Sequence, residues 1–81
     1  MKAYQIRKST DGLGVLMWWF DNGWRIVRFP KDQHKGGFPH SYRVEVSKPN
    51  LKNPYMQAAD NLDNLAEARR LVQKCPWLPY Y

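Results

Sequence analysis

Apolar residues dominate both sides of an Asn22-Gly23 pair, in the segment Val-Leu-Met-Trp-Trp-Phe-Asp-Asn-Gly-Trp-Arg-Ile-Val-Arg-Phe that spans residues 15–29. Asn-Gly between apolar β-forming residues is the strongest local signal for a β-hairpin with a two-residue type I′ turn. Such a turn would pair Trp19 with Ile26 and Trp18 with Val27. One face of this hairpin would then carry Leu16, Trp18, Phe20, Arg25, Val27 and Phe29, and the other Val15, Met17, Trp19, Asp21, Trp24, Ile26 and Arg28.

Both predicted faces of the hairpin are largely apolar. A sheet that contacts the core on one side alone usually alternates apolar with polar residues. We therefore expect the second face to be covered, either by another part of the chain or by a partner.

Alternation predicts further strands on both sides of the hairpin. Residues 2–8 form a first strand, and residues 41–47 form another with Tyr42, Val44 and Val46 toward the core. Pro30 ends the strand that follows the Asn-Gly turn, because proline cannot donate to the ladder. Residues 31–40 and 48–54 have the composition of loops, and residues 55–58 are a candidate short edge strand.

The C-terminal third changes to a helical period. Asn64 and Glu67 have the spacing of an N-cap and its reciprocal partner, and Pro76 ends the helix that follows. Asn61, followed by Leu62, is a competing start one turn earlier. The apolar helix face carries Leu65, Ala68, Val72 and Cys75, with Leu71 at its border. The tail at residues 76–81 is too apolar for a disordered segment, so we expect Trp77 or Leu78 to pack back on the domain.

Together these elements predict an α+β fold in a single domain over residues 1–81. Its antiparallel sheet has three to five strands centred on the Trp-rich hairpin, and one C-terminal helix packs on one face of that sheet.

Charge adds an expectation about partners. The net charge is +6, and residues 1–54 hold ten Lys or Arg against four acidic residues, whereas residues 55–81 hold three of each. Such an excess favours an acidic partner, a protein surface or a nucleic acid, although solubility alone also explains it. The single cysteine excludes an internal disulfide, and no segment is long and apolar enough for a signal or a membrane span. We therefore expect a cytoplasmic protein with no membrane partner.

Catalytic and metal chemistry find little support. Cys75 lies on the predicted inner helix face, far from His34 and His40 in a loop, so no nucleophile–base pair is indicated. One Cys and two His match no structural zinc pattern, and the glycines match no phosphate-binding loop. We predict no enzyme activity, no catalytic residue, no metal site and no cofactor.

Binding is better supported, because aromatic rings beside guanidinium groups are typical of protein interfaces and of base-stacking platforms. The bland alternative is that Trp18 and Trp19 simply fill opposite cores. The predicted partner-binding residues are Trp19, Trp24, Arg25, Arg28, Lys31, Lys35, Arg43 and Arg7.

Three functional hypotheses follow. The first is a non-enzymatic inhibitor or adaptor of the phage or mobile-element type, which docks on a host protein or nucleoprotein complex with an acidic surface, as anti-defence proteins do. The alternative is a DNA- or RNA-binding module that uses the basic face of the sheet. The strand order, followed by a helix that opens on Asn-Leu-Ala-Glu-Ala-Arg-Arg, resembles small sheet-plus-helix DNA-binding modules of plant transcription factors and recombinase arms, in features that many folds share. A homodimer that buries the second hairpin face is compatible with both hypotheses.

Overall fold

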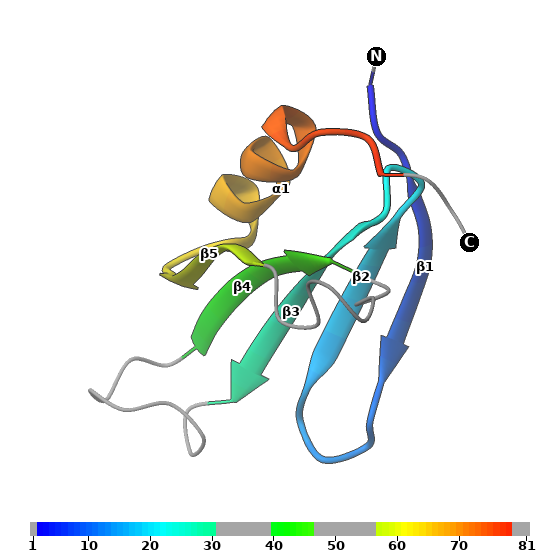
Figure 1. Ribbon diagram of the computed structural model, residues 1–81. Coiled ribbons are helices and arrows are strands. Elements are labelled where there is room, and N and C mark those ends of the chain that lie inside the picture. Colours follow the sequence, from blue (N-terminus) through cyan, green and yellow to red (C-terminus); the bar gives the residue numbers. More distant parts are fainter. Residues whose placement is uncertain (1, 31–39, 47–56, 79–81) are drawn as a thin grey trace.

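The computed structural model describes residues 2–30, 40–46 and 57–78. Within them the strands β1 (Gln5–Thr10), β2 (Leu16–Phe20), β3 (Trp24–Pro30), β4 (His40–Val46) and β5 (Gln57–Leu62) precede the helix α1 (Leu65–Lys74). All neighbouring strands are antiparallel, and their order in the sheet is their order in the chain. The helix packs on one face of this sheet (Figure 1). The predicted α+β fold is therefore confirmed.

The strand boundaries differ from the predictions at the two ends of the sheet. β1 begins at Gln5 and extends to Thr10, because the turn to β2 closes later than the sequence indicates. In this turn the Asp11 carboxylate accepts hydrogen bonds from the N–H groups of Leu13 (2.7 Å) and Val15 (3.2 Å). β5 occupies residues 57–62 rather than 55–58. The predicted loops at 31–40 and 48–54 lie outside the described residues, except for residue 40, which begins β4.

The central hairpin has a different turn from the predicted one. Trp19 pairs with Arg25 and Trp18 with Ile26, so the loop consists of the three residues 21–23. The Gly23 N–H donates to the Phe20 carbonyl at 3.4 Å, and Gly23 alone in this loop has a positive φ, of 91°. A type I′ turn needs positive φ at both central residues, whereas three-residue hairpin loops end on one left-handed residue. The predicted two-residue turn is therefore wrong, and with it the predicted pairing.

This one-residue difference in register exchanges the faces of β3. Side chains alternate along a strand, so a slip of one position moves every side chain to the other face. The inner face under α1 therefore receives Trp24 and Ile26 beside Trp18 and Phe20, and Arg25 moves to the outer face. In β4 the predicted core positions are confirmed, because Tyr42, Val44 and Val46 are buried; Ser41 at the start of the strand is buried as well.

The helix begins after Asn64, as the Asn64–Glu67 spacing predicts, and not at the competing start Asn61, which lies in β5; its last residue is Lys74, with Cys75 as the C-cap before Pro76. The Asn64 side chain accepts a hydrogen bond from the Glu67 N–H at 2.8 Å, and Ala68 and Val72 are fully buried against the sheet. Pro76 follows the last turn. Each large apolar side chain buried in this layer contributes about 1.5 to 3 kcal/mol.

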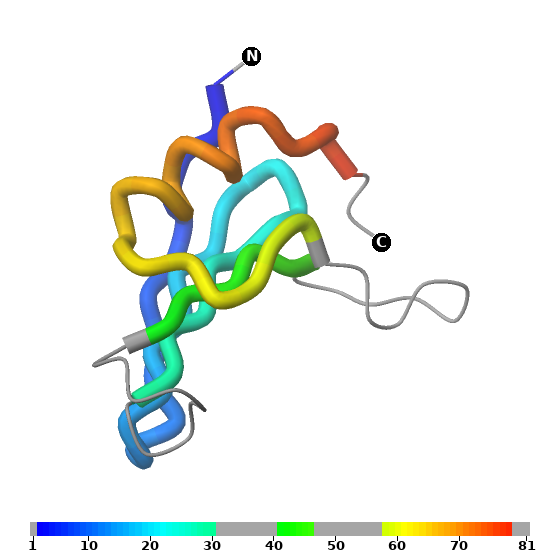
Figure 2. Tube along the Cα trace, turned by 90° about the vertical axis from the view of Figure 1, so that its left-hand side faces the viewer, coloured from blue at the N-terminus to red at the C-terminus, as the bar shows by residue number. Residues whose placement is uncertain are grey.

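Both ends of the described chain are attached near the central turn. At the beginning, the Asp21 N–H donates to the Tyr4 carbonyl at 3.0 Å and the Tyr4 N–H donates to Asp21 Oδ1 at 2.8 Å. The Gln73 side chain accepts from the Ala3 N–H at 2.9 Å and donates to the Ala3 carbonyl at 2.7 Å. The Leu78 N–H donates to the Asn22 carbonyl at 2.9 Å, and its side chain packs against the core, as predicted for Trp77 or Leu78. In Figure 2 the helix and the segment after it accordingly lie at the same end of the molecule as residue 2.

Candidate functional site

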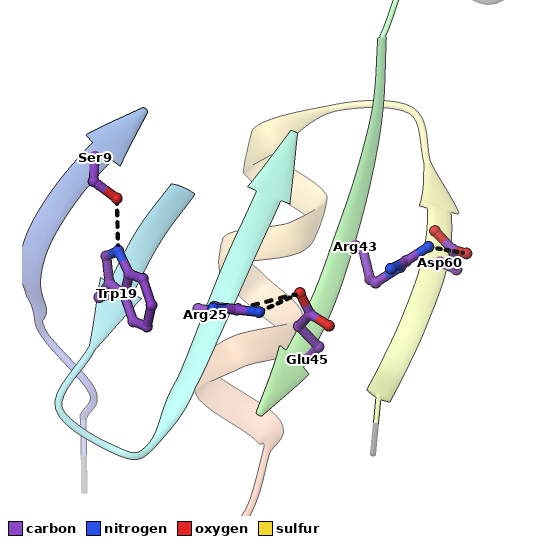
Figure 3. A network of polar contacts seen from close by, with 6 residues as sticks. All are labelled: Ser9, Trp19, Arg25, Arg43, Glu45 and Asp60. Carbon is purple, nitrogen blue, oxygen red and sulfur yellow. Dashed lines mark hydrogen bonds and ion pairs between the residues drawn. The ribbon is translucent and has the colours of Figure 1, made fainter. Parts of the chain in front are cut away.

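The face of the sheet opposite α1 carries the polar and aromatic side chains that the sequence singled out. We call it the outer face and define it by the residues whose register places them there, namely Arg7, Ser9, Met17, Trp19, Arg25, Val27, Arg43, Glu45 and Asp60. Figure 3 shows six of them in front of the sheet, with α1 behind it. No other described helix or strand packs on this face.

A row of stacked groups crosses the outer face from β1 to β4. Arg7 and Arg25 flank Trp19 from the two neighbouring strands, with their Cζ atoms 4.1 Å and 4.9 Å from the centre of its ring. The Trp19 indole N–H donates to the Ser9 hydroxyl at 3.0 Å (Figure 3). Guanidinium groups at these distances are attracted to the ring by about 0.5 to 1 kcal/mol each at exposed sites. The indole is therefore held in one orientation before any partner arrives.

Two ion pairs continue the row. Arg25 Nη2 lies 3.1 Å from Glu45 Oε1, with 24% and 20% of the two side chains exposed. Arg43 Nη2 lies 3.3 Å from Asp60 Oδ2, and its guanidinium also covers the Phe29 ring. Partly exposed pairs of this kind contribute about 0 to 1 kcal/mol each. Their main effect is to neutralise two of the three arginines of the outer face.

Arg7 differs from the other two arginines. It is exposed, it stacks on Trp19, and it contacts no carboxylate among the described residues. The outer face therefore presents one uncompensated guanidinium on a fixed indole, beside two neutral ion pairs.

The structure separates the predicted binding residues into three groups. Arg7, Trp19, Arg25 and Arg43 lie together on the outer face. Trp24, 3% exposed, is in the core and donates its indole N–H to the Pro76 carbonyl at 2.8 Å, so its predicted place on a binding surface is wrong. Its outward position depended on the two-residue turn.

The other predicted binding residues also lie away from the outer face. Arg28 pairs with Leu16 and Tyr42, which puts it on the inner side of the sheet. Its buried Nε has no hydrogen-bond partner among the described residues. Lys31 and Lys35 lie outside the described residues.

Cys75 is a core residue. Its side chain belongs to the buried cluster under α1, and burial raises the pKa of the thiol. A raised pKa keeps the sulfur protonated at neutral pH and lowers its nucleophilicity.

The described residues contain no group of three His, Cys, Asp or Glu side chains arranged to hold a metal ion. In this part of the chain, no helix has the length and apolar character of a membrane span.

Sequence reasoning missed a second group of cations. Lys2, Arg69 and Arg70 line a groove of about 390 Å³ between the start of β1 and α1. Lys2 is remote from the helix in sequence, and residues 69 and 70 had the pattern of an ordinary solvated helix surface. The sequence feature that could have pointed to this group is the adjacent pair Arg69-Arg70.

Comparisons with models of known families, with curated proteins and with solved structures gave no match for the chain.

Proposed function

We propose that the protein is a non-enzymatic binding protein that docks through its outer face on an acidic surface of a host protein or nucleoprotein complex, as an inhibitor or adaptor of the phage or mobile-element type. The stack of Arg7 on Trp19 carries the proposal. Tryptophan and arginine are enriched among the residues that dominate interface energies, and an indole already fixed by neighbours loses little freedom on binding. A cytoplasmic location belongs to the same proposal, because the chain has one cysteine and no disulfide partner for it.

Direct binding of DNA or RNA by the outer face is the weaker alternative. Glu45 and Asp60 lie on the same face and neutralise Arg25 and Arg43. A continuous phosphate backbone would meet these two carboxylates, whereas a protein partner can present a single carboxylate to Arg7 alone. Phosphate binding depends on several uncompensated cations and weakens steeply with salt. The net charge of +6 favours this alternative, so the experiment below tests it as well.

A capture experiment tests the proposal. The tagged protein is incubated with lysate of its source cell, with and without nuclease, at about 50 mM and about 200 mM salt. Arg7→Glu and Trp19→Ala change the outer face, and Lys74→Glu repeats the charge reversal on α1, away from that face. Circular dichroism confirms that each variant is folded.

The expected result is one discrete protein or complex that survives nuclease and the higher salt. It is retained by the wild type and by Lys74→Glu, and is lost with Arg7→Glu and Trp19→Ala. Equal retention by all variants would reject the outer face as the docking surface. Recovery of nuclease-sensitive and salt-sensitive material alone would replace the proposal by direct nucleic-acid binding.

A further inference from the structure

β1 is an edge strand whose second side has no partner among the described residues. Apolar side chains are exposed beside this edge, since Tyr4 is 61% and Ile6 59% exposed (Figure 1 shows the strand at the margin of the sheet). An unpaired edge presents backbone N–H and C=O groups that can pair with another extended chain.

The groove described above adjoins the first half of this edge. Its apolar walls include Ala3 and Phe20, and its three cations are Lys2, Arg69 and Arg70. Arg69 Nη2 donates to Gln5 Oε1 at 3.3 Å, and Gln73 holds the backbone of Ala3, so helix and strand keep the groove in place. None of its described lining residues is acidic.

The charge along β1 determines which strand can add to it. Arg7 and Lys8 lie at the centre of the strand, which contains no acidic residue. A second copy of this chain would oppose these cations with its own, and like charges across a strand pair are destabilising. Pairing with an acidic strand is therefore stabilised by Arg7 and Lys8, whereas pairing with a second copy of β1 is destabilised by them.

We propose that an extended acidic peptide segment of a partner protein adds to β1 as a further strand and places a carboxylate in the groove between Lys2, Arg69 and Arg70. The register irregularity between Gln5 and Arg7 divides the edge, so backbone pairing runs along residues 7–10 and side-chain recognition along residues 2–5. A peptide fits better than a nucleic acid, because only a peptide has backbone amides to pair with the edge. This site goes beyond the proposed outer face. The two share Arg7, but the groove residues Lys2, Arg69 and Arg70 lie outside that face.

The test uses the full chain, labelled with ¹⁵N, and a decapeptide of alternating valine and glutamate as the probe. Two further versions of the peptide carry N-methyl groups, one on its valine amides and the other on its glutamate amides. In a strand, alternate residues direct their N–H groups to opposite edges, so one methylated peptide loses the bonds to β1 and the other keeps them. Affinity and amide shifts are measured for the wild type, Arg70→Glu and Lys74→Glu, which make the same charge change on the same helix inside and outside the groove.

We expect amide shifts in residues 2–10, loss of binding with one methylated peptide only, and an affinity lowered by about tenfold in Arg70→Glu against less than about threefold in Lys74→Glu. Absence of binding, equal behaviour of the two methylated peptides, or equal effects of the two variants would overturn the proposal. The proposal would also be overturned by a single-stranded oligonucleotide that binds more tightly than the peptide, displaces it and shifts the same amide signals. That result would assign the groove to phosphate. Trp19→Ala removes the indole of the outer face and leaves the groove residues Lys2, Arg69 and Arg70 unchanged, so it separates a failure here from a failure of the proposed function.

Discussion

Two small residues in the central turn connect distant parts of the molecule. The buried Asn22 amide donates to the Val72 carbonyl of α1 at 3.0 Å, and its oxygen accepts from the Trp24 N–H at 3.2 Å. Gly23 leaves no room for a side chain, because an added Cβ would lie 2.9 Å from the Leu78 Cβ. This turn therefore determines more than the direction of the chain, since the helix and the tail both pack against it.

Gly23→Ala tests that contact, with Gly12→Ala as its match. Both glycines have positive φ, of 91° and 80°, but no atom lies within 4 Å of an added Cβ at Gly12. Positive φ costs an alanine about 1 to 2 kcal/mol, and overpacking adds about 1 to 3 kcal/mol. We expect urea denaturation to show a clearly larger loss of unfolding free energy for Gly23→Ala. Equal losses would mean that Leu78 does not pack on the turn.

Cys75 should react slowly with a thiol reagent at pH 8 in the folded protein and rapidly after denaturation, because burial raises the pKa of its thiol above the ordinary 9.0. The same pKa shift makes the unfolding free energy depend on pH. The folded state keeps the proton longer, so the stabilisation is complete below the unfolded pKa and is lost as pH rises through the folded pKa. Denaturation of the wild type and of Cys75→Ala across this alkaline range isolates the contribution. If the Cys75 thiol of the folded wild type reacted as fast as in the denatured protein, the predicted protection by burial would be contradicted.

The secondary-structure elements differ in how well the sequence alone predicts them. The helix at residues 65–74, its Asn64 cap and the alternation of β4 were predictable, because each depends on local spacing. The register of the central hairpin was not, since both of its faces are apolar and neither register exposes an obviously wrong side chain. The choice depends on the burial of Asn22 against a carbonyl 50 residues further on, which no local pattern contains.

The candidate site was predictable in part for the same reason. Arg7, Trp19 and Arg43 were expected on one surface and lie together on the outer face. Trp24 was misplaced by the register. The groove residues Lys2 and Arg70 come from opposite ends of the chain and meet only through the tertiary fold.

Deletion of Asp21 tests the turn as an element. The shortened loop has two residues between the same flanking residues, Phe20 and Trp24, so the observed register can remain. A two-residue type I′ turn, however, needs positive φ at Asn22, and the deletion removes the Asp21 groups that bond to Tyr4. We expect a lower unfolding free energy with cooperative unfolding retained, because Trp24 and Ile26 stay in the core while the bonds of Asn22 to Val72 and of Asp21 to Tyr4 are lost. Deletion of Leu13, an exposed residue of the β1–β2 turn, is the control and should leave a cooperative fold. Loss of cooperative unfolding in the Asp21 deletion would show that the register does not survive the shorter loop.

At the scale of the whole molecule, Gln73 fastens the beginning of the described chain to its last helix. Ala3 is buried, so its backbone groups need the two hydrogen bonds that the Gln73 side chain supplies. We expect Gln73→Ala to lower the unfolding free energy by about 1 to 3 kcal/mol. Gln73→Glu keeps the acceptor for the Ala3 N–H and loses the donor, so its cost should be intermediate. Hydrogen exchange at Ala3 measures the same effect locally.

The attachment of both ends near residues 21–23 also has a consequence for the order of events during protein synthesis. The sheet is a meander, so each strand can pair with its predecessor as it leaves the ribosome. The Asn22 side chain, by contrast, meets its Val72 acceptor only after residue 72 has emerged, and Gly23 is covered only after Leu78 has emerged. Until then Trp24 and Ile26 belong to a nascent sheet with an uncovered apolar face, which is the surface that a ribosome-associated chaperone would recognise.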